Sequence, residues 1–263
     1  MNILMSKPNF YGIFYEINPW MSVEKPVTQQ LAQSQWDVLY QTLLDIGVSI
    51  KLIEPVDGLP DMVFTANAAL VHQNEAWISV FKSVERQPES KYFEAWFAKQ
   101  GYEIMNPASN NPNQLAFEGA GDALFFGEHL AVGYGFRSDR MAYDHPYFKQ
   151  FKLVFCELVD PYFYHLDTCF VPLNASLALW FPDAFSPESQ KSMHKMGQLI
   201  AVPAEEARRF ACNAVVINQH VVLPSGCPET CRLLREHGFT VHECDMSEYI
   251  KSGGACKCLT IIL

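Results

Sequence analysis

The sequence predicts an α/β propeller of five ββαβ units related by pseudo-fivefold symmetry. The first observation behind this prediction is a pattern that occurs five times, in which a polar residue or a cysteine precedes a short apolar run. The second is the nearly constant spacing of these anchor residues, 55, 45, 46 and 45 positions, which is typical of propellers and solenoids. The anchors are Asn67, Asp122, Asp167, Asn213 and Cys258.

In each of the first four units, a polar turn joins the run after the anchor to a second apolar run. The runs are short, rich in β-branched and aromatic residues, and bounded by turn residues, as expected for buried strands. These paired runs span 67–80, 122–134, 167–181 and 213–224. The fifth run follows Cys258, and we expect the N-terminal run Ile3-Leu-Met to complete its unit and close the ring.

Helix-like stretches and further strands fill the segments between these paired runs. Strand-like runs such as 49–53 and 240–243 follow the helical stretches. An ordinary α/β domain with polar strand starts is the alternative, but the nearly equal spacings favour the repeat. No linker or change of composition interrupts the chain, so we expect residues 1–263 to form a single domain. The helices are predicted over Thr28–Ile46, Glu85–Gln100, Pro187–Ile200, Pro203–Phe210 and Pro228–His237.

Composition narrows the class of function. The chain has 263 residues, of which 49% are hydrophobic, and a formal net charge of −10. An acidic chain without basic clusters is suited neither to nucleic acid nor to anionic membranes, whereas a small cationic substrate fits this charge. No apolar run approaches the ~18 residues of a membrane span, and Met1–Met5 is too short for a signal peptide. We therefore expect a cytoplasmic protein, either monomeric or homo-oligomeric.

The eight cysteines do not predict a metal site. They include no C-x2-C pair, and Cys227-x3-Cys231 has no matching second pair, so zinc is not expected. Most of them should be small buried hydrophobic residues. The stretch Gly119-Ala-Gly121 lacks the spacing and the Lys-Ser/Thr ending of a phosphate-binding loop. No cofactor is therefore expected.

The side chains of the anchor residues are of types that can bind and attack a substrate. They comprise one thiol, two carboxylates and two amides, and Asp61, Glu118 and His165 lie beside them in the sequence. Carboxylates and an amide can hold a planar cation that has many N–H donors. A thiolate can then attack its electrophilic carbon, and the nearby positive charge would lower the pKa of the thiol.

Four stretches resemble the guanidino-modifying enzymes: Pro60–Asn67, Phe117–Asp122, His165–Phe170 and Gly253–Thr260. That group contains arginine deiminases, dimethylarginine dimethylaminohydrolases and amidinotransferases, which share the five-bladed pentein fold. The resemblance covers the whole chain in order and implies a pentein catalytic domain. The opening Ile17-Asn-Pro-Trp-Met and the Phe-Thr-Ala-Asn form of the first motif are most similar to the arginine dihydrolase branch, which converts arginine to ornithine, ammonia and carbon dioxide.

The resemblance implies three catalytic residues. Cys258 matches the nucleophile of the family's Gly-Gly-x-x-x-Cys ending, and His165 matches the general acid/base that protonates the leaving amine and then activates water. Glu118 matches the glutamate of the Glu-Gly-Gly-Asp type motif. Here that motif reads Glu-Gly-Ala-Gly-Asp, and the extra residue leaves the role of Asp122 open.

The remaining matched positions are predicted to bind the substrate. Asp167 would bind guanidinium nitrogens, and Arg137 would hold the α-carboxylate. Arg86, Asn18, Asp61 and Asn67 complete this set. The alternative for the two arginines is a solvated surface charge, and Asp61 could simply begin a strand or a turn.

Asn67 departs from the deiminases, which carry aspartate at this anchor. An amide offers both an acceptor and donors, so it could also hold the neutral ureido group of citrulline. This motivates the hypothesis that one site runs two hydrolyses, from arginine through citrulline to ornithine. The alternatives with the same machinery are a dimethylarginine dimethylaminohydrolase, an arginine deiminase and a citrulline hydrolase. A non-catalytic pentein that only binds its ligand is the alternative outside the enzymes.

Cys256 is the nearest rival to Cys258 as nucleophile. The two cysteines are two residues apart, so a strand here would place both on the same face. Cys258 could also be an ordinary buried thiol on a final strand. The family pattern, in which the nucleophile precedes Leu-Thr, favours Cys258.

Overall fold

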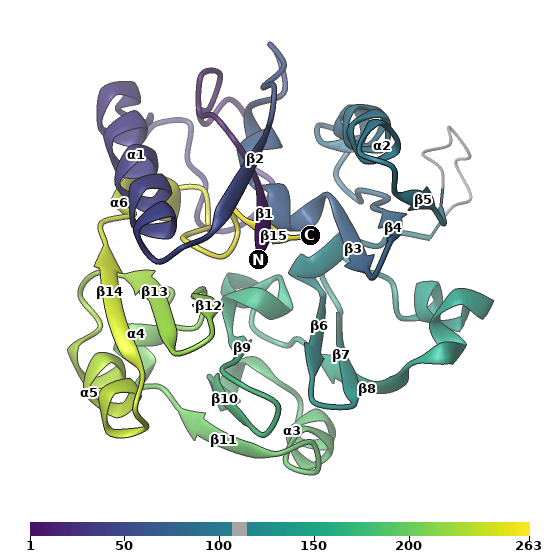
Figure 1. Ribbon diagram of the computed structural model, residues 1–263, viewed down its shortest axis with the longest axis vertical. Coiled ribbons are helices and arrows are strands. Elements are labelled where there is room, and N and C mark those ends of the chain that lie inside the picture. The colour runs from purple at the N-terminus through teal and green to yellow at the C-terminus, as the bar shows by residue number, and fades with distance from the viewer. Residues whose placement is uncertain (107–114) are drawn as a thin grey trace.

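The computed structural model describes residues 1–106 and 115–263. Within them, five three-stranded sheets are arranged as blades around a ring (Figure 1). In every blade the first and second strands are antiparallel and the second and third are parallel. The predicted five-bladed α/β propeller is therefore confirmed.

The blades follow one another along the chain and are numbered in that order. Blade 1 contains β3 (Ala69–His72), β4 (Glu75–Ile78) and β5 (Glu103–Ile104), and blade 2 contains β6 (Ala123–Phe126), β7 (His129–Tyr134) and β8 (Lys152–Glu157). Blade 3 contains β9 (Phe170–Pro172), β10 (Leu177–Trp180) and β11 (Gln198–Ala201), and blade 4 contains β12 (Val215–Ile217), β13 (His220–Pro224) and β14 (Thr240–Cys244).

The two ends of the chain share blade 5, which closes the ring. It contains β15 (Ile261–Ile262), β1 (Asn2–Ser6) and β2 (Ser49–Ile53). Strand β15 pairs antiparallel with β1, which pairs in parallel with β2. The two ends accordingly lie close together near the centre of the ring (Figure 1). The predicted completion of the fifth unit by the N-terminal run is confirmed.

Helices lie outside the strands and cover the blades (Figure 1). α1 (Gln29–Asp45) buries one face through Ala32, Trp36, Leu39 and Leu43, at the spacing of an amphipathic helix. It matches the predicted helix closely, as does α5 (Pro228–Glu236). α2 (Ser90–Lys99) begins later than predicted, because a 3-10 turn at Gln87–Glu89 precedes it. α6 (Ser247–Ile250) is a single turn near the end of the chain.

Two predicted helices are too long. α3 ends at Met193, so that only Pro187–Met193 is helical, and the rest of the predicted Pro187–Ile200 helix contains β11. Pairing with β10 decides this, because the third blade needs its parallel strand there. α4 covers only Ala204–Ala207 of the predicted Pro203–Phe210. In blade 2, 3-10 turns at Arg140–Asp144 and Pro146–Gln150 take the place of an α-helix.

All five anchors are buried just ahead of the first strand of a blade. Three of them lie in or beside short 3-10 turns that the sequence pattern did not predict, at Thr65–Asn67, Gly119–Gly121 and Leu166–Thr168. Residues 256–259 form a turn ahead of β15. The expectation that Cys256 and Cys258 share a strand face is therefore wrong.

The eight cysteines are free and buried, as the composition predicted for most of them. Within 1–106 and 115–263 no group of histidine, cysteine or acidic side chains is arranged to hold a metal ion. No helix in this part of the chain is long and apolar enough to cross a membrane.

Candidate active site

One small cavity collects most of the residues that the sequence singled out. Seven of the nine predicted site residues line it: Asn18, Asp61, Asn67, Arg86, Arg137, His165 and Cys258. The other two, Glu118 and Asp167, lie directly behind this lining, in contact with His165 and Cys258. Because these residues come from segments far apart in the sequence, the ring itself assembles the site.

Asn213 fixes the position of Cys258. Its Nδ2 donates hydrogen bonds to Cys258 Sγ (3.1 Å) and to the carbonyl of Asp167 (3.0 Å). Its Oδ1 accepts from the backbone N–H groups of Ala255 (3.0 Å) and Cys258 (3.1 Å). The sequence analysis named Asn213 as an anchor but not as a site residue. Its place in the repeat was the signal that could have found it.

The surroundings of Cys258 disfavour its thiolate form. Burial raises its pKa and the neighbouring Asp167 adds to this, while hydrogen bonds from the Ala255 backbone and Asn213, together with the charge of Lys257, oppose the rise. Asp167 Oδ2 accepts from Sγ at 3.6 Å. Burial also raises the pKa of Asp167 to about 7, with Lys257 acting against it. A bound cation would stabilise the thiolate and so lower the pKa of Cys258.

His165 is oriented by a buried carboxylate. Its Nε2 lies 2.8 Å from Glu118 Oε2, which also accepts from Arg137 Nη1 at 3.2 Å. Burial alone would raise the pKa of Glu118, but Arg137, His165 and Arg86 outweigh it and hold that pKa well below its usual range. An ionised Glu118 can only accept a hydrogen bond, so Nε2 of His165 is the nitrogen that donates to it, and Nδ1 is the nitrogen left for the substrate side.

A buried ion pair sets the orientation of Asn67. Glu89 accepts from Nε and Nη2 of Arg86, both at 2.9 Å, and Arg86 Nη1 donates to Asn67 Oδ1 at 2.9 Å. Only the amide oxygen can accept from a guanidinium, so this contact decides which way the amide faces. Among the described residues, the Nδ2 of Asn67 has only a long contact of 3.5 Å, to the carbonyl of Glu118. The amide therefore keeps a donor and one lone pair for a ligand.

Asp61 has an unused acceptor in the same cavity. Its Oδ2 accepts from the Tyr15 hydroxyl at 2.8 Å, whereas the buried Oδ1 has no partner among the described residues. Burial raises the pKa of Asp61, and Arg86 opposes that rise. A buried acceptor without a partner is costly unless a ligand or water satisfies it. An N–H donor of a bound molecule would do so.

Arg86 and Arg137 are both buried, so the surface-charge alternative is wrong for each of them. Arg137 Nη2 donates to the carbonyl of Ile17 at 3.0 Å, and its guanidinium lies over the ring of Tyr164. Asn18 is half-buried and its Nδ2 donates to the carbonyl of Ser252 at 3.0 Å. Both residues therefore border the cavity in defined orientations.

Asp122 and Cys256 are placed away from the cavity lining. Asp122 accepts from the backbone of Leu166 (3.0 Å) and from the hydroxyl of Ser138 (2.6 Å), so it joins the second and third anchor segments. The thiol of Cys256 is buried and hydrogen-bonds with that of Cys244. Of the two candidate nucleophiles, only Cys258 reaches the cavity.

A protein-family model described as N,N dimethylarginine dimethylhydrolase, eukaryotic, matches residues 17–263. The chain belongs to this family. The imidazole, thiol and carboxylate of the cavity lining agree with this family and with hydrolysis of guanidino C–N bonds.

The names of two curated relatives state different activities. The bifunctional arginine dihydrolase/ornithine cyclodeaminase ArgZ of Synechocystis is 41% identical over 99% of the chain and 37% of the relative, so the chain spans just over a third of ArgZ. The N(G),N(G)-dimethylarginine dimethylaminohydrolase of Mycobacterium tuberculosis is 39% identical over 98% of the chain and 84% of the relative. Both support an arginine-modifying hydrolase.

Solved structures agree with this assignment of the chain to the family. The N-terminal domain of ArgZ, a cyanobacterial arginine dihydrolase, bound to its substrate, superposes with a TM-score of 0.92 at 40% identity, covering 99% of the chain and 97% of that domain. The dimethylarginine dimethylaminohydrolase of Pseudomonas aeruginosa, in complex with citrulline, has a TM-score of 0.82 at 22% identity over 99% and 98% of the two chains. The latter likeness supports the pentein fold alone.

The packing around Gly121 explains why the second family motif needs a glycine at this position. A Cβ at this position would lie 2.2 Å from Nδ2 of Asn67. Gly121→Ala is therefore expected to displace the Asn67 amide and to lower kcat/KM by roughly 10²-fold, the effect of moving a positioning group by about an ångström. Steady-state kinetics on the guanidino substrate would measure this. Ala120→Gly, at the neighbouring motif position, is the matched control, and equal losses in both variants would contradict the explanation.

Glu89 is the positioning residue that the sequence analysis missed. Glu89→Gln would leave the buried Arg86 without its ionic partner. Breaking a buried ion pair costs about 3–5 kcal/mol of the free energy of unfolding. We expect a loss of this size in chemical denaturation, together with a higher KM because Arg86 no longer holds Asn67. Glu85→Gln, on the same segment, should change neither quantity, and a Glu89→Gln protein of unchanged stability would contradict this role.

Proposed function

We propose that the protein is an arginine dihydrolase in which residues 1–263 act as one catalytic domain. It hydrolyses L-arginine with two waters to L-ornithine, two molecules of ammonia and carbon dioxide. Cys258 forms the covalent intermediates, and His165 acts as general acid/base. The observation that carries this proposal is the Asn67 amide, which Arg86 holds with a donor and a lone pair left for a ligand.

In the first round the cation enters between carboxylates. Asp61 Oδ1 accepts N–H groups of the guanidinium from within the cavity, and Asp167 does so from behind Cys258 Sγ. The charge of the guanidinium stabilises the thiolate of Cys258. The thiol proton passes to Nδ1 of His165, and Sγ attacks the guanidinium carbon. His165 returns the proton to the terminal nitrogen, the C–N bond breaks and ammonia leaves. Water deprotonated by His165 then attacks the same carbon, the C–S bond breaks, and citrulline is released from the sulfur.

In the second round citrulline undergoes the same attack before it leaves the cavity. Its ureido oxygen is an acceptor, so the Nδ2 donor of Asn67 can bind it where an aspartate would repel it. Sγ adds to the ureido carbon, and the second ammonia departs with a proton from His165. Water cleaves the C–S bond to give an ornithine carbamate, which loses carbon dioxide.

The remaining cavity residues would hold the amino-acid end of the substrate. Arg137 offers a guanidinium to the α-carboxylate, and Arg86 and Asn18 border the same space. Arg137 also pairs with Glu118, so carboxylate binding and the orientation of His165 share one residue. We expect no metal or cofactor to take part. A cytoplasmic location and assembly into a homo-oligomer stay predictions.

A dimethylarginine dimethylaminohydrolase is the second candidate, because the relative from M. tuberculosis carries that name. Phe64 and Met21 line the cavity and offer apolar surface to N-methyl groups. An arginine deiminase would stop after the first round, and a citrulline hydrolase would perform only the second. A non-catalytic binding module has no need for a buried thiol beside an imidazole paired with a carboxylate.

Product analysis separates these activities. The purified protein is incubated in parallel with arginine, citrulline and N(G),N(G)-dimethylarginine, and ornithine, citrulline, ammonia and dimethylamine are measured separately. The proposal expects ornithine and ammonia in a ratio of one to two from arginine. Release of dimethylamine with no turnover of arginine would favour the second candidate, and citrulline as the final product would favour a deiminase.

A further inference from the structure

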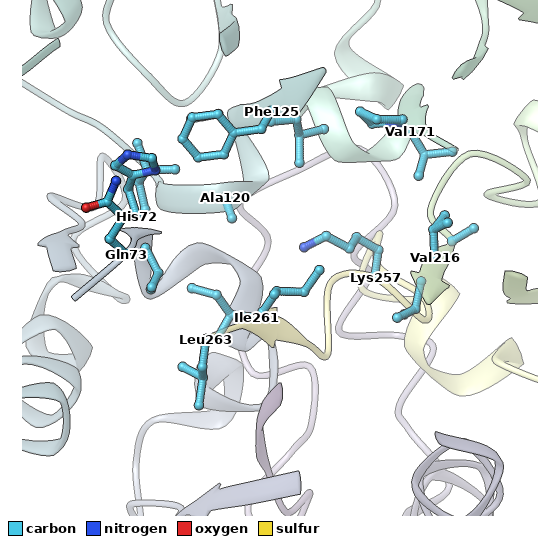
Figure 2. A pocket seen from close by; sticks show the side chains of 17 residues that line it. His72, Gln73, Ala120, Phe125, Val171, Val216, Lys257, Ile261 and Leu263 are labelled. Atoms are coloured by element: carbon cyan, nitrogen blue, oxygen red, sulfur yellow. The ribbon is translucent and has the colours of Figure 1, made fainter. Parts of the chain in front are cut away.

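A second cavity lies between the blades, near the centre of the ring (Figure 2). It has a volume of about 410 Å³, within the range of small-molecule sites. Its lining includes a residue from the first strand of every blade: Leu70, Leu124, Val171, Val216 and Ile261. The active-site cavity is lined instead by residues outside the strands, and the two linings share no residue.

Lys257 places a buried cation in this second cavity. Its side chain extends into the space between the blades, as Figure 2 shows. The residue is only 8% exposed. Nζ donates one hydrogen bond, to the carbonyl of Thr260 at 3.2 Å, and its other two donors have no partner among the described residues. Asp167 interacts with this ammonium electrostatically but makes no hydrogen bond with it among the described residues, so the two free donors still need acceptors from a ligand or water.

The walls around this ammonium are mostly aliphatic. Of the described residues in the lining, Lys257, His72 and Gln73 are the ones whose side chains carry polar groups, and His72 and Gln73 lie together (Figure 2). A cavity with one cation and apolar walls can bind a molecule that has one negative charge and an apolar remainder. A phosphate dianion would require several donors, and a guanidinium would be repelled.

We propose that this cavity binds a small aliphatic monocarboxylate. The carboxylate accepts hydrogen bonds from Lys257 Nζ, and the hydrocarbon chain packs against Val171, Val216 and Ile261. The site is separate from the arginine site. Lys257 immediately precedes Cys258, and its charge opposes the rise in the pKa of both Cys258 and Asp167. A ligand bound to Lys257 would therefore contact the residue next to the proposed nucleophile, from outside the active-site cavity.

Calorimetric titration with hexanoate tests the proposal without relying on turnover. The titration uses the Cys258→Ser protein saturated with arginine, so that Arg86 and Arg137 cannot capture the probe. Hexanoate should bind, while hexan-1-ol and hexylamine, of the same chain length, should bind at least tenfold more weakly. The loss of a charge-assisted hydrogen bond is worth about 10–100-fold in affinity.

Two further substitutions in the same background locate the binding. Lys257→Met removes the charge and is expected to weaken hexanoate binding at least tenfold, whereas Lys257→Arg should retain it. Val216→Phe fills the cavity without removing the ammonium and should weaken binding as well. Circular dichroism and thermal unfolding would show that each variant is folded. No binding of hexanoate to the arginine-saturated protein, equal binding of hexan-1-ol, or full affinity in both Lys257→Met and Val216→Phe would overturn the proposal.

Discussion

Cys258→Ser is expected to lower turnover of arginine by roughly 10⁴-fold or more, the usual effect of removing a catalytic nucleophile. Serine is close in size and can still hydrogen-bond with Asn213, so the fold should be kept. Its hydroxyl, however, is a far weaker nucleophile near neutral pH than a thiolate stabilised by a bound cation. Initial rates of ammonia release in the variant and in the parent protein measure the loss.

Cys256→Ser is the matched control for this experiment. Cys256 lies two residues away and is equally buried, but its thiol pairs with that of Cys244 and does not line the cavity. The variant should keep its rate within about tenfold, with some loss of stability from a polar hydroxyl in an apolar cluster. Loss of turnover in Cys256→Ser with retention in Cys258→Ser would reverse the assignment of the nucleophile.

Asn67→Asp is expected to convert the protein from an ornithine producer into a citrulline producer. Aspartate can still accept from Arg86, so guanidinium binding and the first round should continue. The second round loses the Nδ2 donor, and the ureido oxygen then faces a carboxylate. A buried acceptor left without its donor costs about 1–3 kcal/mol, so the rate on citrulline should fall roughly 10–100-fold.

The time course of citrulline and ornithine from arginine measures this change. Citrulline offered directly as substrate is the internal control, because it bypasses the first round. The variant should turn it over slowly, and the parent protein should not. Mainly ornithine from Asn67→Asp would show that the amide is not what permits the second hydrolysis.

The fold could be predicted because its information is repeated along the chain. The anchor spacing, together with the paired apolar runs, identified the first strands of the blades, and the N-terminal run was expected to close the ring. The error in the helix that begins at Pro187 has a local cause. Residues 198–201 suit either a helix or a strand, and only pairing with β10 decides between them. The 3-10 turns at the anchors are too short to show a helical periodicity in the sequence.

The site was predicted less completely than the fold. Residues with chemistry in a motif, such as His165 and Cys258, could be named because their side-chain types and spacing match a reaction. Glu89 could not be named, because it acts only through Arg86, and a carboxylate in a charged stretch resembles a solvated one. Asn213 was visible as an anchor, but its four hydrogen bonds around Cys258 depend on the closed ring.

Mass spectrometry of acid-quenched protein during turnover tests the central claim most directly. Arginine and citrulline carrying a ¹³C label at the guanidino or ureido carbon are used as parallel substrates, and the labelled residue is located by peptide fragmentation. The account predicts label on Cys258 from both substrates and none on Cys256. Label on any other residue, or complete turnover of both substrates with no covalent label at any time of quenching, would contradict it.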